Sequence, residues 1–172
     1  MTRKMLSVHT LAGVVFSLLA FVPNNLAPLT ATAFAEDTAA TTNCVPVGGV
    51  LFTNIGAIAG ETNLGPVYGD LAGSVAATIL GQNKNGTYNV QHYWVTASGD
   101  NITMKVAVLT PTYPEPTDMA IVAVPWGNYK STISGGTGKY AGATGYLDYF
   151  GIADFTQNTL VLRYRGQVCY AN

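Results

Sequence analysis

Glycines crowd residues 135–145, where five of the chain's 19 glycines fall within eleven positions. Glycine reaches positive φ without a Cβ clash, so such a cluster marks a tight turn or a bulge. Residues 128–133, which alternate in character as in a strand, precede the cluster, and the aromatic-rich run 146–150 follows it. The cluster therefore predicts a hairpin corner between two strands, with Tyr140 as the large side chain that anchors the corner to a core. Its spacing does not match the GxGxxG pattern of phosphate-binding loops.

Short apolar runs separated by turn signals make up the chain beyond residue 47, and no window keeps a 3.6-residue period. Residues 83–86 and 98–101 have the composition of hairpin turns, and the proline-rich segment 111–116 is expected to be a surface loop. Residues 56–68 are expected to be a glycine-rich connection that carries Glu61. The expected strands are residues 48–55, 70–81, 87–97, 102–110, 120–124, 129–133, 143–150 and 159–170. About eight strands with no helix to cover a sheet face favour closure into a barrel or a sandwich.

The N-terminal segment has the features of a secretory signal. Arg3 and Lys4 form a positive region, the apolar run 11–22 is too short for a membrane span, and residues 33–35 fit a cleavage site. The alternative is a retained membrane anchor. The expected organisation is a signal peptide over residues 1–35 that is removed, a flexible leader over 36–46 and one domain over 47–172. The expected location is secreted or periplasmic, with no stable membrane anchor after cleavage.

Charge and cysteine content agree with an exported domain. Nine acidic and eight basic residues are present, and two of the basic ones lie in the predicted signal, so the mature chain is slightly acidic. It has no basic stripe, which makes nucleic acid an unexpected partner. The two cysteines, Cys44 and Cys169, lie near the ends of the mature chain, and we expect them to form a disulfide that ties the first strand to the last. The alternative is a catalytic thiol.

The glycine-rich stretch GGTGKYAGATG resembles the GGTGKFxxARG segment of plant dirigent proteins and the GGSGxFxGAxG segment of allene oxide cyclases. Residues 69–75, the Asn-Gly hairpin and the Tyr/Trp strand that runs into residues 98–100 follow the order of features in these families. The resemblance covers residues 48–170. It implies an all-β fold, a single small antiparallel eight-stranded β-barrel that is calycin-like in form.

The resemblance also implies a site inside one end of the barrel. Phe52-Thr53-Asn54 stands where dirigent proteins carry a Phe-Asp-Asp-type segment, which makes Asn54 the matching polar group. Neither Thr53 nor Asn54 is a carboxylic acid, so Glu61 is the nearest substitute, unless it is a solvated loop glutamate. His92 is a candidate general base, and its alternative is a wall histidine bonded to a neighbour. The predicted catalytic residues are Asn54, Glu61 and His92.

Aromatic residues and one arginine are the candidates for binding a substrate. Tyr88 and Trp94 share the face of His92 on one strand. Arg163 and Arg165 share a face of the last strand, which is either a solvated outer face or an anchor for a carboxylate ligand. Tyr146 and Asp148 alternate with Leu147 and Tyr149, and either pair can line a pocket. The predicted binding residues are Tyr88, Trp94, Tyr129, Tyr149 and Arg165.

Three classes of function remain open. The first is a cofactor-free cyclase or isomerase-type protein that binds a small, mostly apolar reactive intermediate and guides its cyclisation or stereochemistry. The second is a non-catalytic barrel that binds a small hydrophobic molecule, and the third is a structural barrel filled by its own side chains. No metal or cofactor is expected, because one mature histidine and two paired cysteines leave no ligand set. A homo-oligomer is compatible with the sequence. Two glycosylation sequons begin at Asn85 and Asn101.

Overall fold

A computed structural model of the chain describes residues 43–115, 117 and 119–172. The predicted signal peptide, residues 1–35, and residues 36–42 of the predicted leader lie outside the described residues. The strands are β1 (Asn43–Ala59), β2 (Thr62–Gly69), β3 (Gly73–Gln82), β4 (Tyr88–Thr96), β5 (Asn101–Met104), β6 (Ala107–Leu109), β7 (Ile121–Val124), β8 (Tyr129–Gly136), β9 (Thr144–Asp154) and β10 (Thr159–Tyr170). A short 3-10 turn, Gly138–Tyr140, precedes β9, and the described residues contain no α-helix.

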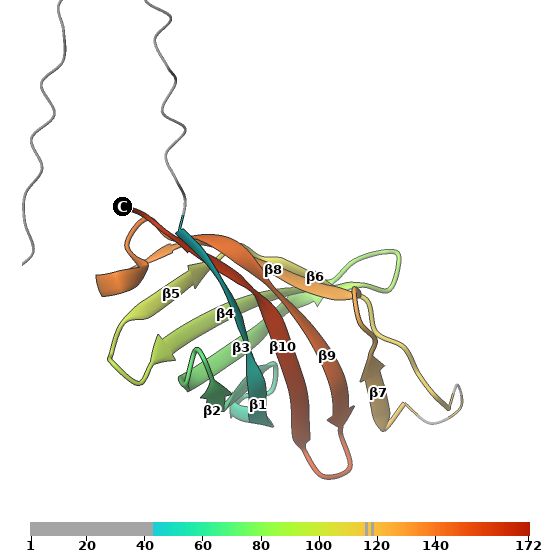
Figure 1. The fold of residues 1–172 in the computed structure, drawn as a ribbon. Coiled ribbons are helices and arrows are strands. Elements are labelled where there is room, and N and C mark those ends of the chain that lie inside the picture. The colour runs from blue at the N-terminus through green and yellow to red at the C-terminus, as the bar shows by residue number, and fades with distance from the viewer. Residues whose placement is uncertain (1–42, 116, 118) are drawn as a thin grey trace, which may run out of the picture. The chain divides into compact units, whose positions relative to one another are not determined.

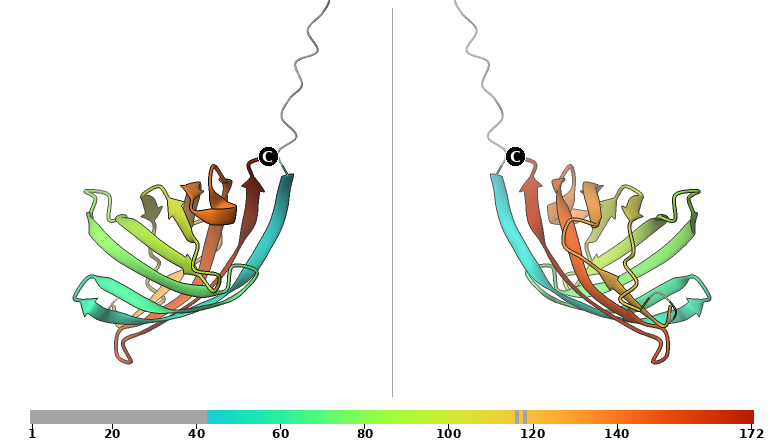
Figure 2. Two further views of the ribbon diagram at one scale, coloured as in Figure 1. Left: turned by 90° about the vertical axis from the view of Figure 1, so that its left-hand side faces the viewer. Right: turned by 90° about the vertical axis from the view of Figure 1, so that its right-hand side faces the viewer.

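These segments close into an eight-stranded antiparallel barrel, as the resemblance implied (Figures 1 and 2). The strands from β1 to β4 pair successively in sequence order, as do those from β8 to β10, and β10 returns to pair with β1 over twelve residues, Asn43 to Asn54. β5 and β6 both pair with β4 and β8, so together they make one interrupted strand. β7 and β8 both pair with β9 on the side away from β10, and they make another. The predicted all-β barrel is confirmed.

Three local predictions were wrong. Residues 62–68 were expected in a connection, but they belong to β2, which pairs with both β1 and β3. This pairing is close because Gly65 has no side chain: a Cβ there would meet the Phe52 carbonyl oxygen and lie 2.8 Å from the Thr53 Cα. Residues 43–46, expected in the flexible leader, are the first residues of β1. Residues 102–110 were expected to form one strand, but they are split into β5 and β6, and the break turns Val106 and Val108 outward whereas Ile102 and Met104 face the core.

One end of the barrel is filled by its own side chains. Trp94 is 1% exposed, and its indole N–H donates to the Leu71 carbonyl oxygen at 3.0 Å. The Leu71 backbone N–H donates in turn to the Tyr164 hydroxyl, also at 3.0 Å. The Trp94 and Tyr164 rings meet edge to face with centroids 5.4 Å apart. This packing plugs the lumen at the end where β1 starts and β10 finishes.

The glycine cluster forms the predicted corner between β8 and β9. Gly138 has φ of 52° and Gly142 has φ of 69°, which are left-handed values that favour glycine. Tyr140 is fully buried, as expected for the anchor of the corner. The backbone N–H of Asn101, at the start of β5, donates to the Thr137 side chain at 2.8 Å and fixes the corner to the neighbouring hairpin.

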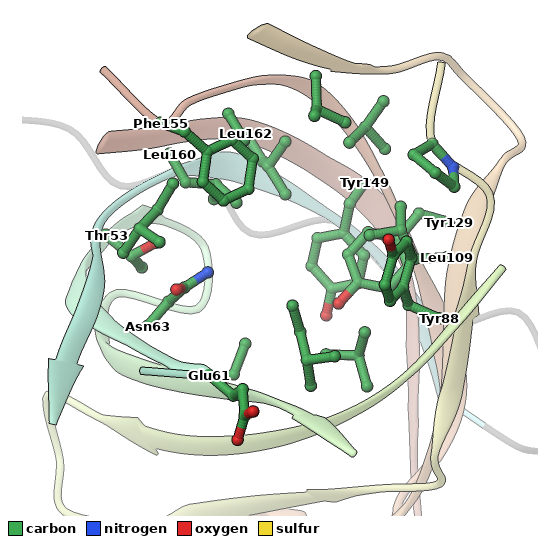
Figure 3. A pocket seen from close by; sticks show the side chains of 18 of the residues that line it. Thr53, Glu61, Asn63, Tyr88, Leu109, Tyr129, Tyr149, Phe155, Leu160 and Leu162 are labelled. Atoms are coloured by element: carbon green, nitrogen blue, oxygen red, sulfur yellow. The ribbon is translucent and has the colours of Figure 1, made fainter. Parts of the chain in front are cut away.

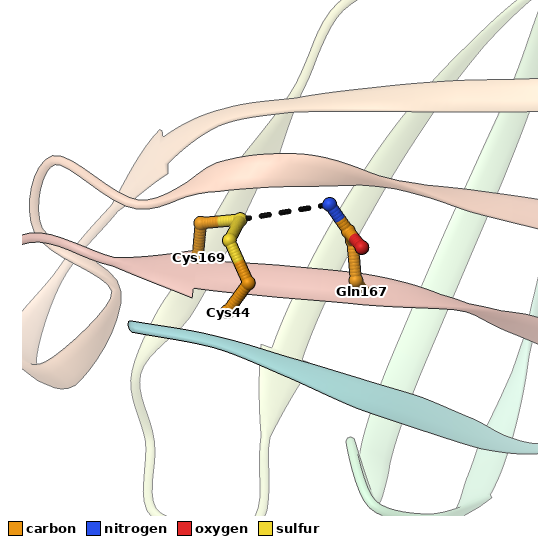
Figure 4. The surroundings of a disulfide bond; sticks show 3 residues. All are labelled: Cys44, Gln167 and Cys169. Carbon is orange, nitrogen blue, oxygen red and sulfur yellow. Dashed lines mark hydrogen bonds between the residues drawn. A yellow bond between two sulfur atoms is a disulfide. The ribbon is translucent and has the colours of Figure 1, made fainter. Parts of the chain in front are cut away.

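Cys44 and Cys169 form the predicted disulfide (Figure 4). The two residues are 125 positions apart in the sequence and are direct register partners on β1 and β10. The bond therefore joins the first and last strands at the seam where the barrel closes.

Candidate functional site

The end of the barrel opposite the packed plug contains a cavity of about 390 Å³ (Figure 3). Every strand of the closed barrel except β5 contributes to its wall, and so does the loop between β6 and β7. Its apolar lining includes Leu51, Val75, Ile79, Val90, Leu160 and Leu162. A pocket of this size and polarity is typical of sites for small organic molecules.

His92 lies in the cavity wall with both ring nitrogens engaged. Its Nε2 is 2.7 Å from the Tyr129 hydroxyl, and its Nδ1 is 3.1 Å from the Ser131 hydroxyl. The alternation of β4 turns His92 inward, and the alternation of β8 turns Tyr129 and Ser131 inward to meet it. All three side chains are buried, with exposed fractions of 4%, 4% and 0%. The result is a hydrogen-bonded chain of neutral groups.

Tyr149 completes this group from β9. Its ring stacks on His92 with centroids 5.2 Å apart and planes inclined by 14°, and its centroid lies 4.9 Å from that of Tyr129. The Tyr149 hydroxyl donates to the Met104 sulfur at 3.6 Å. We refer to His92, Tyr129, Ser131 and Tyr149 as the aromatic cluster.

Burial keeps the aromatic cluster uncharged. Desolvation lowers the pKa of His92 from 6.5 to about 4, so its imidazole is neutral at physiological pH. Desolvation also raises the pKa of Tyr129 well above the ordinary phenol value, and the nearby Tyr149 raises it further. The pKa of Tyr149 is raised by burial, and the hydrogen bond with Ser131 offsets part of that rise.

A second group of polar side chains lies on β1 and β2 and in the turn that joins them. Thr53 is 4% exposed, and its hydroxyl makes no hydrogen bond. Asn63 and Glu61 also line the cavity. Figure 3 shows Thr53 and Asn63 across from Tyr129 and Tyr149, with Glu61 at the edge of the cavity. The topology agrees, because β2 and β8 are four strands apart in the eight-stranded ring. We refer to Thr53, Asn63 and Glu61 as the polar pole.

Two phenols lie on the wall near the β6–β7 loop. Tyr88, at the start of β4, accepts a hydrogen bond from the Gln82 amide at 3.0 Å. Tyr113, from the loop between β6 and β7, is hydrogen-bonded to Tyr88, and burial followed by this bond raises its pKa. The loop is held to β7 by a β-bridge between Thr112 and Ala123. This places Tyr113 and Pro111 over the cavity.

The structure brings five predicted site residues together around the cavity: Glu61, Tyr88, His92, Tyr129 and Tyr149. Both readings of His92, a general base and a wall histidine bonded to its neighbours, are compatible with this placement, since His92 is bonded and also lines the cavity. Of the two pairs on β9, Leu147 and Tyr149 face inward. The catalytic and binding roles of these residues stay predictions.

Three other predicted site residues lie away from the cavity. Asn54 is exposed on β1, because the strand alternation turns its neighbour Thr53 inward instead. Trp94 belongs to the packed plug. Arg165 is exposed on the outer face, where its guanidinium lies 3.4 Å from the centre of the Trp126 ring. For Arg163 and Arg165 the outer-face alternative therefore holds.

Several cavity residues had not been predicted, namely Thr53, Asn63, Tyr113 and the supporting Ser131. The alternation of residues 129–133 in the sequence places Ser131 on the same face as Tyr129, so that signal was present. Asn63 and Tyr113 lie in segments that carried no strand pattern, so nothing in the sequence assigned them a direction.

The described residues contain no group of three or more histidine, cysteine or carboxylate side chains that could hold a metal ion. Within the same residues, no helix has the length and hydropathy needed to cross a membrane.

The fold and the cavity define a closed antiparallel β-barrel with a plugged end and a ligand-sized lumen. No family model matches the chain, and no curated protein matches it. Among solved structures, the chain is similar to the pterocarpan synthase dirigent protein GePTS1, with 13% identity, a TM-score of 0.33 and coverage of 86% of this chain and 98% of that one. It is also similar to the pterocarpan synthase dirigent protein PsPTS1, with 13% identity, a TM-score of 0.30 and coverage of 75% and 96%.

Proposed function

We propose that the barrel binds a small, mostly apolar molecule in its lumen and guides the stereochemistry or cyclisation of that molecule without a cofactor. The observation that carries this proposal is the apolar cavity of about 390 Å³ with a neutral His–Tyr–Ser chain in its wall. The disulfide supports an exported protein, because such bonds persist in oxidising compartments.

The apolar wall supplies most of the affinity in this proposal. Each square ångström of apolar surface removed from water contributes about 25 cal/mol, so burying about 200 Å² of a ligand contributes about 5 kcal/mol before the entropy of association is subtracted. The lumen also keeps water from the ligand. Exclusion of water protects a reactive intermediate from hydrolysis and restricts the conformations in which it can react.

The aromatic cluster supplies orientation. In one tautomer His92 donates from Nε2 to the Tyr129 oxygen and accepts at Nδ1 from Ser131, which leaves the Tyr129 O–H free to donate to an oxygen of the ligand. A phenol O–H placed in a low-dielectric wall stabilises negative charge that develops on such an oxygen. In the other tautomer Tyr129 donates to His92 and can accept from the ligand. The pair can thus match either polarity without becoming charged.

A non-catalytic binding barrel is the second candidate, and the pKa of His92 favours it. A base with a pKa of about 4 is weak at neutral pH, so His92 is a poor proton acceptor for catalysis. Both candidates require an accessible lumen, and the cavity argues against a barrel filled by its own side chains. The two candidate functions differ in whether the barrel directs a chemical change in the bound molecule.

Two alanines on β3 give a matched test of lumen binding. Ala77 lines the cavity, whereas Ala76 faces outward between Leu64 and Tyr93, which are both exposed. We expect the neutral fluorescent probe N-phenyl-1-naphthylamine to bind the parent protein saturably. Ala77→Phe should weaken binding at least about tenfold by filling the lumen, and Ala76→Phe should leave it unchanged. Equal affinity in both variants would place the probe outside the lumen and overturn the proposal.

A further inference from the structure

Charge is distributed unevenly around the cavity. Among the described residues that line it there is one carboxylate, Glu61, and neither a lysine nor an arginine. His92 is neutral for the reason given above. The two arginines of β10 that could have met a carboxylate ligand, Arg163 and Arg165, are exposed on the outer face.

The Thr53 hydroxyl is the second observation. Buried polar side chains are nearly always hydrogen-bonded, yet this hydroxyl is buried, lines the cavity and bonds to no protein group. Its neighbours in the polar pole are Asn63, whose amide group also lines the cavity, and the exposed Glu61. Together they can donate to and accept from a hydroxyl, whose single O–H group needs both.

We infer that the lumen selects an uncharged molecule with an apolar body and a hydroxyl group at the polar pole, and that it rejects carboxylates. This inference rests on the proposed lumen binding and names the class of ligand for it. The second polar atom of the ligand, a carbonyl or ether oxygen, faces the Tyr129 hydroxyl on the opposite wall. Thr53 and Glu61 are then residues that determine specificity.

Rejection of anions has two physical causes. An ionised carboxylate that leaves water for an apolar wall loses its solvation, and no cationic side chain in the described lining compensates for that loss. Glu61 adds repulsion at the polar pole, although its exposure to solvent weakens this effect. Desolvation is therefore the larger cause of the rejection of anions, and repulsion by Glu61 is the smaller one.

Three naphthalene probes of the same ring system separate these effects: naphthalene-2-methanol, 2-methylnaphthalene and 2-naphthoate. Calorimetric titration of the full mature protein at neutral pH gives the affinity of each. We expect the alcohol to bind at least about tenfold more tightly than the carboxylate, because the carboxylate is desolvated without a counter-charge. Thr53→Val should lower the affinity for the alcohol about fivefold and leave the affinity for the methyl compound unchanged, because only the alcohol loses a hydrogen bond. Thr132→Val, on the exposed face of β8, is the matched control and should change neither of these two affinities.

Glu61→Gln completes the series. It should raise the affinity for the carboxylate a few-fold and leave the affinity for the alcohol unchanged. If 2-naphthoate binds as tightly as the alcohol, and Ala77→Phe abolishes both, the selection of uncharged ligands is wrong although lumen binding stands. The selection is equally wrong if Thr53→Val weakens the alcohol and the methyl compound to the same extent. If Ala77→Phe affects none of the probes, lumen binding itself is wrong and the inference falls with it.

Discussion

His92 has an environment that no single feature of the sequence dictates. Three side chains from β8 and β9 surround its ring: Tyr129 and Ser131 bond its nitrogens, and Tyr149 stacks on its face. Each contact is satisfied by the neutral imidazole. A proton added to His92 would have to be accommodated beside two phenols and a hydroxyl, with no carboxylate among these partners.

This environment predicts that stability falls in mild acid. The unfolded chain takes up a proton on His92 below pH 6.5, but the folded protein resists protonation down to about pH 4. Stability is therefore fully present above pH 6.5 and decreases as the pH falls toward 4, by about 3 kcal/mol in total. Urea unfolding followed by Trp fluorescence across this range measures the effect.

His92→Gln is the control for that measurement. Glutamine keeps polar atoms near Tyr129 and Ser131 but does not titrate, so the variant should start less stable and lose most of the slope between pH 6.5 and 4. No other histidine lies among the described residues, so the assignment is specific. An unchanged slope in the variant would show that His92 is not desolvated in the folded protein.

Strand alternation showed which residues share a face, but not which face points inward. The run from Tyr88 to Thr96 groups His92 with Tyr88 and Trp94, and the structure turns this face inward. On β1 apolar residues occupy both faces, because Leu51 is buried while the adjacent Phe52 is 44% exposed. The resemblance to the Phe-Asp-Asp segment then selected Asn54, and the side chain that points inward is Thr53.

At the scale of an element, the corner between β8 and β9 shows how glycines position two strands. Gly136 approaches the start of β5 so closely that a Cβ there would meet the Asn101 carbonyl oxygen and lie 2.7 Å from the Tyr140 Cβ. Gly138 combines a left-handed φ with the Asp100 carboxylate in the space a Cβ would need. Glycine content predicted this corner from sequence, whereas the pairing partners of β2 were hidden by the glycines that let it approach β1.

Gly136→Val is expected to destabilise the protein by at least about 2 kcal/mol, because the side chain must displace backbone in a packed corner. Gly60→Val is the matched control, since a Cβ at Gly60 meets nothing within 4 Å and its φ is not left-handed. Thermal melts of the parent and both variants give the comparison. Equal melting temperatures for the parent and Gly136→Val would contradict the close approach of β8 to β5.

At the scale of the whole described domain, closure of the barrel divides the interior into a plug and a lumen. The large residues Trp94, Tyr140 and Tyr164 fill one end, while the other is lined mainly by medium-sized aliphatic side chains. The sequence predicted eight strands and no helix, and the resemblance supplied the barrel. Which end stays open depends on how side chains from several strands meet, and neither pattern nor spacing contains that information.

The disulfide acts on the same scale, because it covalently closes the ring. The bond between Cys44 and Cys169 joins positions 125 apart, and loop entropy predicts a stabilisation of about 5 kcal/mol before native strain. Part of this effect duplicates the ladder between β1 and β10, which holds the same strands together by hydrogen bonds.

We therefore expect the double variant Cys44→Ala, Cys169→Ala to remain folded and to lose about 3–5 kcal/mol in urea unfolding. Because the bond lies at the plugged end, far along β1 from Thr53, binding of a neutral probe in the lumen should persist below the unfolding transition. Adding a reductant should bring the parent protein to the stability of the double variant and leave the variant itself unchanged. A parent protein whose stability does not respond to reductant, or whose cysteines react with alkylating reagent before reduction, would show that the seam is not covalently closed in solution.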